Sequence, residues 1–365
     1  MKVNLLGYER NALTDFMAEL GEPSYRTDQI LKWIHQRNVT DFSEMTDLSK
    51  QLRGRLGEIA SVEGLRAVGD TVSTDGTRKW LLQLDDGNCV ETVFIPEDSR
   101  GTLCISSQVG CSLTCSFCAT GRQGFNRNLT TAEIIAQVRF AINMLSTDRI
   151  SRPITNIVLM GMGEPLLNYG QVVPALRLML DDCSYGFSRR KVTLSTAGVI
   201  PGIKRLLTDC PVSLAVSLHA PDDELRNQLV PINRKYPIAD LMAACADYAR
   251  YDRRWRVTFE YIMIRDVNDS IRHARNLVRL LADVPSKVNL IPYNSVTGLD
   301  YERSSTQSID RFRDVLLAAD VMTITRKTRG DEVAAACGQL VGRFKDRTKR
   351  SSRLGTALAD VALAE

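Results

Sequence analysis

The sequence predicts an α/β fold: a partial, open (β/α)6 barrel preceded by a small helical domain and a β-hairpin extension. Short apolar runs that end in Gly, Ser or Asn alternate with helical patterns across residues 101–325, which is typical of a parallel sheet with right-handed crossovers. Six such runs are present, fewer than the eight strands of a complete barrel. Helical periodicity before residue 60 predicts the separate N-terminal domain.

Residues 1–75 are expected to form a basic helical accessory domain with a linker at its end. Apolar residues recur about every 3.6 positions in residues 11–20, 25–37 and 47–59. Gly21-Glu22-Pro23 separates the first two helices because Gly and Pro interrupt helical structure. The basic residues of this segment include Arg26, Lys32, Arg37, Lys50, Arg53 and Arg55.

Residues 76–100 predict the β-hairpin extension. Two alternating runs flank Asp85-Asp86-Gly87-Asn88, a sequence that favours a tight turn between antiparallel strands. The next run, residues 101–110, predicts the first barrel strand, which leads into a cysteine-rich loop.

The rest of the barrel is expected to alternate helix and strand. Predicted helices cover residues 130–145, 169–182, 200–209, 240–252 and 270–284, and predicted strands cover residues 154–165, 191–198, 212–220, 255–264 and 287–294. Residues 326–365 form a C-terminal segment that carries Cys337 and a basic tail.

Composition indicates a protein of the cytosol. The net charge is +4, with basic clusters at 189–191, 253–256, 326–329 and 343–353 that could contact nucleic-acid phosphates or simply be solvated. No signal peptide and no apolar run long enough for a membrane span is evident, so we expect a cytoplasmic protein with reduced thiols. Nine cysteines then indicate metal binding or thiol chemistry rather than structural disulfides.

Three of these cysteines are closely spaced. Cys111, Cys115 and Cys118 form a C-x3-C-x2-C pattern directly after the first predicted barrel strand. A structural zinc site needs four protein ligands, and no fourth Cys or His follows nearby. A four-iron cluster held by three cysteines leaves one iron able to bind a small molecule. A zinc knuckle or a chance grouping is the alternative.

Polar residues also follow the later predicted strands, and they would gather at one edge of the sheet. The carboxyl ends of parallel strands form the active-site face of a barrel. Each residue alone is a weak signal because Gly, Ser and Asn commonly end strands, but their succession predicts a binding site. These residues are Gly163, Glu164, Ser195, Ser217, Leu218, His219 and Asn294.

The cysteine spacing, with Phe117 before the last cysteine, resembles the radical S-adenosylmethionine (SAM) superfamily. This resemblance implies that Cys111, Cys115 and Cys118 hold a 4Fe–4S cluster whose fourth iron binds the amino and carboxylate groups of SAM. Gly163-Glu164 resembles the superfamily's Gly-Glu element, which meets the amino group. The other strand-end residues named above are then expected to bind the same cofactor.

Longer motifs narrow the resemblance. CSLTCSFCATG, GMGEP, LSTAG, SLHA, TRGDEVAAACGQL and GFNRNLT resemble, over nearly the whole chain, the bacterial dual-specificity RNA methyltransferases of this superfamily. The resemblance implies methylation of C2 of adenine-2503 in 23S rRNA and of adenine-37 in tRNA. That carbon is electron-poor and cannot attack a methyl group as a nucleophile, whereas a carbon radical can add to it.

The resemblance also implies roles for three further residues. Cys337 would take a methyl group from one SAM, and a 5′-deoxyadenosyl radical from a second SAM would remove hydrogen from that methyl before it adds to C2. Glu91 would remove the C2 proton, and Cys104 would attack the sulfur of Cys337, leaving a disulfide. An electron donor such as flavodoxin or ferredoxin and a thiol reductant would also be needed. Without the resemblance, the two cysteines would be buried packing residues and Glu91 an exposed strand residue.

RNA contacts are expected from the helical start and from the basic residues near Arg326 and Arg343. Tyr25, Phe125 and Trp33 could stack on bases, although Trp33 is better explained as a core residue. A monomer with no membrane partner is expected. Cys89, Cys183, Cys210 and Cys245 match no role.

Three alternatives remain at this point. A sister enzyme that methylates C8 of the same ribosomal adenine shares the cluster and both catalytic cysteines, although the long basic helical start favours the C2 enzyme. A radical enzyme that acts on a small metabolite would need no RNA. A non-enzymatic iron–sulfur or zinc protein would show no radical chemistry.

Overall fold

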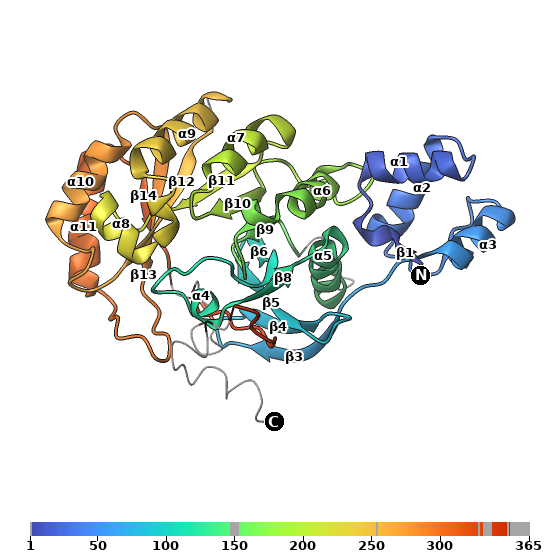
Figure 1. Ribbon diagram of the computed structural model, residues 1–365, viewed down its shortest axis with the longest axis horizontal. Helices are drawn as coiled ribbons and strands as arrows, with labels where there is room; N and C mark the ends of the chain where they lie inside the picture. Colours follow the sequence, from blue (N-terminus) through green and yellow to red (C-terminus); the bar gives the residue numbers. More distant parts are fainter. Residues whose placement is uncertain are drawn as a thin grey trace.

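A ten-stranded sheet runs through the part of the chain that the computed structural model describes, which is residues 2–146, 153–252, 255–327, 329–330, 338–348 and 350. The strand order is β14-β13-β12-β11-β10-β9-β6-β5-β4-β3. Neighbours from β14 to β6 are parallel, and neighbours from β6 to β3 are antiparallel. Figure 1 shows helices along the outer side of the parallel part and a helical module at one end of the molecule.

The parallel part confirms the predicted α/β fold class and adds one strand to the prediction. The seventh strand is β14, which has only three residues and was missed for that reason. The parallel strands are β6 (Arg100–Cys104), β9 (Asn156–Leu159), β10 (Val192–Thr196), β11 (Ser213–Ser217), β12 (Val257–Met263), β13 (Ser286–Pro292) and β14 (Thr323–Thr325).

The helices bury one apolar face, and α5, α8, α10 and α11 begin at a side-chain cap, whereas α4, α6, α7 and α9 do not. Thr130 and Glu133 form a reciprocal capping box at the start of α5. The predicted helices are α5 (Thr131–Leu145), α6 (Tyr169–Leu180), α7 (Ile200–Asp209), α9 (Ile238–Arg250) and α10 (Ile271–Leu281), and the structure adds α4 (Ala119–Gln123), α8 (Asp223–Leu229), α11 (Thr306–Ala318) and the 3-10 turns η4 (Pro165–Asn168) and η5 (Pro231–Arg234).

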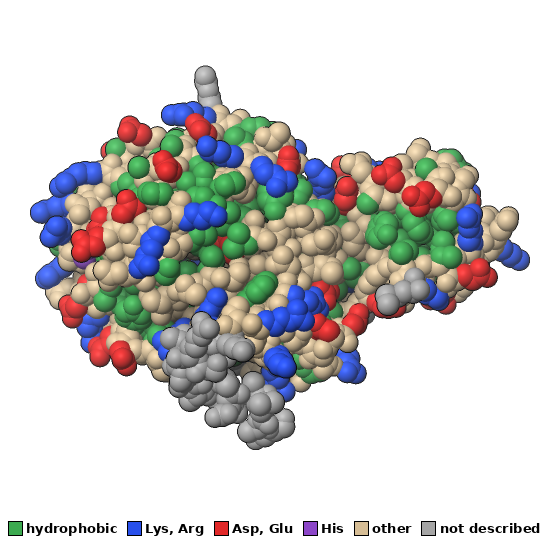
Figure 2. All heavy atoms as spheres, viewed as in Figure 1, with side chains coloured by type: hydrophobic (Ala, Val, Ile, Leu, Met, Phe, Trp, Pro, Cys, Tyr) green, Lys and Arg blue, Asp and Glu red, His purple; other side chains and the backbone are tan. Residues whose placement is uncertain are grey.

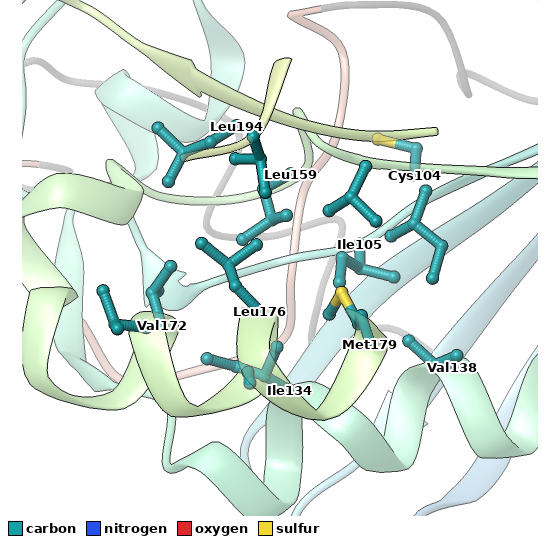
Figure 3. Packing of buried hydrophobic residues seen from close by; sticks show 14 of the residues in the cluster. Cys104, Ile105, Ile134, Val138, Leu159, Val172, Leu176, Met179 and Leu194 are labelled. Carbon is teal, nitrogen blue, oxygen red and sulfur yellow. The ribbon is translucent and has the colours of Figure 1, made fainter. Parts of the chain in front are cut away.

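The core lies between the sheet and the helices that cover it. Figure 3 shows Leu159 and Leu194 of the sheet packed against Leu176 and Met179 of α6 and Ile134 of α5. These side chains are buried, and burial of each contributes about 1.5–3 kcal/mol to stability. The core therefore fixes the strands whose carboxyl ends carry the predicted site.

The N-terminal module (residues 2–62) is helical, as its periodicity predicts. Its first and last segments are joined by a short parallel pair between β1 (Val3–Asn4) and β2 (Ala60–Ser61). Trp33 is buried and donates to Asp47, which agrees with a core role. The module contains η1 (Leu5–Gly7), α1 (Arg10–Glu19), α2 (Tyr25–Leu31), the π-helical turn η2 (Lys32–Gln36), η3 (Phe42–Glu44) and α3 (Lys50–Ile59).

The hairpin extension has three strands rather than two. β4 (Arg78–Gln83) and β5 (Cys89–Glu97) flank the predicted turn, where Gly87 adopts a φ of +80°. β3 (Arg66–Val72) pairs with β4 and begins within the range assigned to the helical domain and its linker. The domain boundaries given by the sequence remain a prediction.

The predicted strand over residues 101–110 is divided in two. β6 ends at Cys104, and β7 (Gln108–Gly110) pairs with β8 (Phe125–Asn128) in a separate small sheet. The chain turns between them because Ser106 donates its N–H to Gln137 Oε1 (2.8 Å) and its hydroxyl to the Glu91 carbonyl (2.7 Å). The three-cysteine loop therefore starts and ends on β7 and β8.

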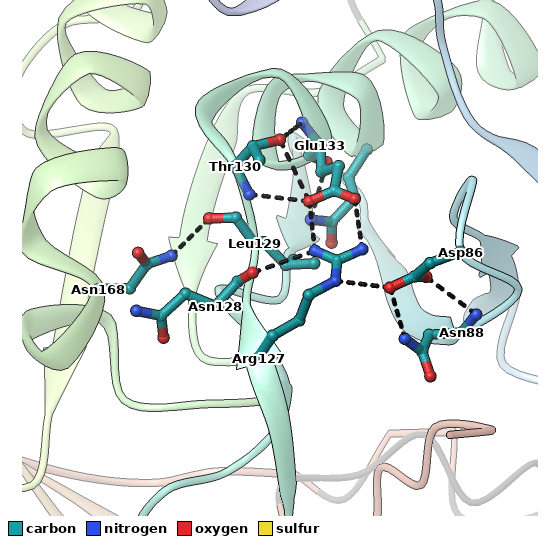
Figure 4. A network of polar contacts seen from close by, with 9 residues as sticks. Asp86, Asn88, Arg127, Asn128, Leu129, Thr130, Glu133 and Asn168 are labelled. Atoms are coloured by element: carbon teal, nitrogen blue, oxygen red, sulfur yellow. Dashed lines mark hydrogen bonds and ion pairs between the residues drawn. The ribbon is translucent and has the colours of Figure 1, made fainter. Parts of the chain in front are cut away.

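Arg127 joins this small sheet to its surroundings. Its guanidinium donates to Asp86 Oδ2 (2.7 Å) in the hairpin turn and to both carboxylate oxygens of Glu133 (2.8 Å each) at the start of α5 (Figure 4). Asn168 donates to the carbonyl oxygens of Ser107 and Leu129 on the other side. Within the described residues, none of the helices has the length and apolar character needed to span a membrane.

Candidate active site

A cavity of about 160 Å³ opens at the carboxyl ends of the parallel strands. Three parts of the chain line it: the loop between β7 and β8, the ends of strands β9 to β14, and the segment after Cys337. Its lining residues include Cys111, Cys115, Phe117, Cys118, Gly163, Glu164, Ser195, Ser217, His219, Glu260, Ile262, Ile291, Arg326, Gly338 and Leu340.

Most of the residues predicted from the strand ends and the cysteine motif line this cavity. Leu218 and Asn294 are buried close to it but are not part of its wall. Asn294 Oδ1 has no hydrogen-bond partner among the described residues. Glu91 and Cys104 also lie outside the wall. Cys337 lies outside the described residues, whereas its neighbour Gly338 is part of the wall.

The cysteine loop is closed at its base by backbone contacts. Cys111 N–H donates to the carbonyl oxygen of Gly124 at 2.7 Å. Gly110 has a φ of +78°, and a Cβ there would lie 2.2 Å from that same oxygen, so only glycine fits. The two ends of the loop are therefore held together without any metal.

Two thiols of this loop are buried, and burial disfavours their ionised form. Burial raises the pKa of Cys111 to about 12 and the pKa of Cys115 well above its usual range, and Cys118 nearby raises both further. Within the described residues, no three Cys, His, Asp or Glu side chains are gathered closely enough to hold a metal ion. The three cysteines lie on one cavity wall and supply the soft sulfur ligands that an iron–sulfur cluster requires.

Glu164 is held rigidly beside the loop. Its Oε1 accepts from Leu166 N–H (3.1 Å) and its Oε2 accepts from Ala197 N–H (2.7 Å). Burial raises the pKa of Glu164 to about 7, although these hydrogen bonds favour the charged form. Gly163 adopts a φ of +103°, and a Cβ there would meet Gln108 at 2.5 Å. A ligand ammonium near Glu164 would favour the ionised carboxylate.

His219 faces the same cavity as a neutral imidazole. Burial, with the charge of Arg226, lowers the pKa of His219 to about 3. Its Nδ1 accepts from Ile262 N–H (3.1 Å), and its ring meets Phe117 edge-to-face at 4.7 Å between centroids. His219 also has a φ of +62°, an uncommon conformation outside glycine that recurs at functional sites.

Arg226 is a site residue that the sequence did not reveal. It is fully buried, and its guanidinium donates to the carbonyl oxygens of Ala197 (2.7 Å), Ser217 (3.1 Å) and Leu218 (3.0 Å). Arg226 therefore fixes the ends of β10 and β11. On sequence it stands in a polar helical stretch, DELRNQL, where an arginine normally faces solvent.

Glu91 is buried rather than exposed. Its Oε1 pairs with Lys79 Nζ (2.8 Å), and its Oε2 accepts from Val341 N–H (2.8 Å). Burial raises the pKa of Glu91, while the Lys79 charge opposes that rise. Glu91 is thereby attached to the segment that follows Cys337.

Cys104 is buried at the end of β6, at the margin of the hydrophobic core that Figure 3 shows. The register pairs it with Val93 of β5 and Val158 of β9. It therefore stands between the hairpin that carries Glu91 and the strand that leads to Gly163.

Residues 338–348 and Arg350, here called the C-terminal strap, cover one side of the cysteine loop. Ala119 N–H donates to the Gly338 carbonyl (2.8 Å), and Cys89 N–H donates to the Arg343 carbonyl (2.7 Å). Thr120 Oγ1 donates to the Leu340 carbonyl (2.6 Å). The strap thus binds both the helix after Cys118 and the strand that carries Glu91.

Arg350 is the second site residue without a sequence signal. Its guanidinium donates to the carbonyl oxygens of Cys111 (3.1 Å), Ser112 (3.3 Å), Leu113 (2.8 Å) and Gly121 (2.7 Å). Four carbonyl groups of the cysteine loop are therefore held in place by one side chain. Its place in a basic tail predicts only a solvated charge.

The basic side chains do not form a single band on the face that Figure 2 shows. Lys and Arg are scattered there among Asp and Glu side chains, over both the barrel and the N-terminal module. Tyr25 is exposed and Phe125 is half-buried. The expected RNA contacts remain a prediction.

Comparison with known proteins agrees with this geometry. Residues 105–278 match the model of the radical SAM superfamily, and residues 3–62 match the model of the ribosomal RNA large subunit methyltransferase N-terminal domain. The fold and the three-cysteine cavity thus define a radical SAM enzyme, a class that implies a 4Fe–4S cluster and SAM.

Two relatives specify the family. The chain is 54% identical to the dual-specificity RNA methyltransferase RlmN of Alcanivorax borkumensis, over 96% of this chain and 93% of that protein. It is 42% identical to a radical SAM methyltransferase from Sphaerobacter thermophilus whose crystal structure superposes with a TM-score of 0.85, over 93% of this chain and 99% of that one. The chain belongs to the RlmN family.

Proposed function

We propose that this chain is a SAM-dependent radical methyltransferase that methylates C2 of adenine-2503 in 23S rRNA and of adenine-37 in tRNA. The 54% identity to a dual-specificity RNA methyltransferase across nearly the whole chain carries this proposal. The convergence of the cysteine loop, the strand ends and the C-terminal strap on one cavity supports it.

The cofactors would occupy the cavity. Cys111, Cys115 and Cys118 would hold the 4Fe–4S cluster. When bound, the cluster and SAM supply a carbon radical able to remove hydrogen from a methyl group. The cavity residues would orient SAM, with Glu164 ionised beside its amino group. The residues in this role are Gly163, Glu164, Ser195, Ser217, Leu218, His219 and Asn294, and two SAM molecules would be used per turnover.

Three residues would handle the RNA. Cys337 would carry the methyl group that becomes joined to C2, and Glu91 would accept the C2 proton. The Cys104 thiolate would then attack the sulfur of Cys337. The S–S bond forms as the C–S bond breaks, and the electron pair goes to the methylene carbon, which takes up a proton and becomes the methyl group. A thiol reductant would return the two cysteines to thiols.

The contacts of Glu91 suit its proposed role. Lys79 favours the ionised carboxylate that a proton acceptor requires, and burial makes that carboxylate more basic. The hydrogen bond from Val341 N–H joins Glu91 to the segment next to Cys337. A displaced strap would therefore remove one hydrogen bond from the proposed proton acceptor.

The proposed partners follow from this chemistry. The N-terminal module and the basic residues near Arg326 and Arg343 would bind 23S rRNA and tRNA. Flavodoxin or ferredoxin would supply the electron, and the protein would act as a monomer. Both RNA substrates are cytoplasmic, so the enzyme would act in the cytoplasm.

The decisive experiment compares four proteins on RNA that lacks the modification: wild type, Cys337→Ala, Cys104→Ala and the control Cys183→Ala. Cys337→Ala should give no product, and Cys104→Ala should accumulate an RNA–protein adduct on denaturing gels. Cys183 has no proposed role, so its variant should match wild type. Mass spectrometry of the nucleoside should find 2-methyladenosine. Finding 8-methyladenosine, or normal turnover by both variants, would refute the proposal.

A further inference from the structure

Glu260 lines the cavity from β12, which is separated by β11 from the strands β9 and β10 that lead to Glu164 and Ala197. The register pairs Glu260 of β12 with Ser217 of β11 and with Asn289 of β13. Laterally paired residues of a sheet point to the same face, so Glu260 shares the inner face with Ser217, a cavity residue. Glu260 is thereby part of the cavity wall, yet no motif singled it out.

Only one of the two carboxylate oxygens of Glu260 accepts a hydrogen bond among the described residues. Its Oε1 accepts from Asn289 Nδ2 at 2.8 Å. Its Oε2 is buried and, among the described residues, has no hydrogen-bond donor in range. The nearest cation is Arg326 Nη1, at 3.8 Å, which is an ion pair but too long for a hydrogen bond. Buried carboxylate oxygens normally accept hydrogen bonds.

Arg326 stands beside Glu260 on the same wall. It follows β14, and its backbone N–H donates to the Leu290 carbonyl (2.8 Å), which fixes its origin on the sheet. Its side chain is 32% exposed, and a guanidinium carries five N–H donors, so it can keep its ion pair and still offer a donor to a ligand group beside Glu260. The pair presents a hydrogen-bond acceptor next to a donor.

Apolar side chains flank this pair. Ile262 follows Glu260 by two residues on β12, and Ile291 lies opposite Ile262 on β13. Both line the cavity. A flat ring placed against the two isoleucines would present its polar edge to Glu260 and Arg326.

Adenine has the matching edge. At its Watson–Crick edge the exocyclic N6 amine is a donor, and the neighbouring ring nitrogen N1 is an acceptor. Glu260 Oε2 can accept from the amine while the guanidinium donates to the ring nitrogen. Hypoxanthine presents the reverse pattern at this edge, with a carbonyl oxygen opposite the carboxylate. Guanine presents the same carbonyl oxygen, so the pair would disfavour both bases.

We propose that Glu260 and Arg326 form an adenine-recognition pair that reads the amine-bearing edge of an adenine bound in the cavity. This inference rests on the proposed function, because both SAM and the target RNA bring an adenine to the cavity. Either adenine has the required chemistry, and the experiment below distinguishes them.

The first arm uses the anaerobically reconstituted full chain and no RNA. S-adenosylhomocysteine and S-inosylhomocysteine are titrated against wild type and Glu260→Gln. If the pair reads the cofactor adenine, wild type binds the adenosyl compound about tenfold or more tightly, as expected for a hydrogen bond to a charged group. Glu260→Gln should weaken adenosyl binding and improve inosyl binding, because the new amide can donate to the hypoxanthine oxygen.

The second arm uses an RNA fragment with adenine or hypoxanthine at the target position, with filter binding as the readout. If the pair reads the RNA base, the same reversal appears here and not in the first arm. A change in either arm supports the pair and identifies its adenine. Unchanged discrimination in both arms overturns the proposal.

Controls separate recognition from folding. Glu302→Gln removes a carboxylate that pairs with Arg265 on the surface, outside the cavity wall, and should change neither arm. Arg326→Met should weaken adenine binding without improving hypoxanthine binding, which gives a second route if Glu260→Gln folds poorly. Iron content and the thermal midpoint are measured for every variant. If nucleoside discrimination persists while no RNA is methylated, the proposed function fails and the adenine pair stands.

Discussion

Two segments are attached to the barrel in different ways. The N-terminal module is held mainly by side chains on helices remote from the cavity. The C-terminal strap is held by hydrogen bonds to the main chain of the cysteine loop and to Glu91. Figure 1 shows the module beyond α5, at one end of the molecule. The first attachment therefore positions a domain, whereas the second shapes the active site.

The module joint combines close packing of η1 against α5, where a Cβ on Gly7 would lie 2.6 Å from Ala132 N, with ion pairs and buried polar contacts. Arg10 donates to both carboxylate oxygens of Asp181, at 2.7 and 2.9 Å, just after α6. His35 lies against Tyr185, with Nδ1 3.3 Å from the phenolic oxygen. Within the described residues, His35 Nε2 has no hydrogen-bond partner. This joint lies away from the cavity wall, so its weakening should leave the cysteine loop intact.

The strap joint has the opposite character. Arg347 N–H donates to the Phe125 carbonyl (3.0 Å), and Asn126 Nδ2 donates to the Lys345 carbonyl (2.7 Å). Together with Arg350 and Val341, these bonds connect the strap to both ends of the cysteine loop and to the proposed proton acceptor. A displaced strap should therefore disturb iron binding and proton transfer together.

Arg350→Ala should have the largest effect. It removes four hydrogen bonds to loop carbonyl groups and should cost the closed loop about 3 kcal/mol. That is about a hundredfold in the ratio of closed to open loop. Iron retained after reconstitution and gel filtration should fall sharply, and methylation with it. Arg10→Ala is the matched control: it removes the ion pair with Asp181, weakens the module joint and should retain iron. Equal losses of iron in the two variants would show that the two joints do not differ in this way.

Lys79→Met should have an intermediate effect. Without the lysine, only the hydrogen bond from Val341 N–H opposes the effect of burial, so the pKa of Glu91 should rise further. Glu91 would then be ionised only at higher pH, and the acid limb of the methylation rate should move to higher pH. The loss is bounded by the roughly 10²–10⁴-fold that a general base contributes. Lys79→Arg should restore the profile, and an unchanged acid limb for Lys79→Met would count against Glu91 as the base.

His35→Phe should have the smallest effect, confined to stability. Burial lowers the pKa of His35 to about 3 from an unfolded value of about 6.5, so unfolding takes up a proton between these values. This contribution is fully present above pH 6.5 and is lost as the pH falls, by at most about 1.4 kcal/mol per pH unit. His219 adds a similar dependence.

Urea unfolding between pH 4.5 and 6.5 checks this expectation. His35→Phe should reduce the dependence of unfolding free energy on pH while leaving iron content unchanged. His273→Gln is the control, since His273 is only half-buried on α10, and burial lowers its pKa in the same direction with a smaller expected contribution. A variant with the full wild-type pH dependence would show that His35 is not the group that titrates.

Periodicity and turn residues predicted most of the fold. The alternation of strands and helices could be predicted, and the alignment of the strand ends at one sheet edge follows from parallel topology. The ends themselves were placed too far along the chain: β9 ends at Leu159, whereas the predicted strand ran to residue 165. The helix α11 was missed although Ile309, Phe312 and Leu316 have helical spacing, because the pattern follows a long irregular stretch. The break between β6 and β7 could not be predicted, since it depends on Gln137, distant in sequence.

The sequence predicts the parts of the candidate site whose residues are close together in the chain. It does not predict the parts whose residues are brought together only by folding. Cysteine spacing predicts a cluster loop without any tertiary information. Arg226 and Arg350 bind backbone carbonyl groups that only folding brings together, and backbone carbonyls leave no mark in a sequence. Glu260 likewise acquires its significance from its neighbours on other strands. The catalytic roles of Glu91, Cys104 and Cys337 remain predictions.

The small sheet formed by β7 and β8 has a thermodynamic consequence for cofactor assembly. Closing a loop costs conformational entropy that grows with the number of residues between its ends. Here Gly110 and Phe125 are paired in the folded protein, so the loop-closure entropy is already lost on folding and not on cluster binding. Binding free energy from the thiolates can then serve affinity for the cluster rather than chain ordering, and a lost cluster can be rebuilt without unfolding the barrel.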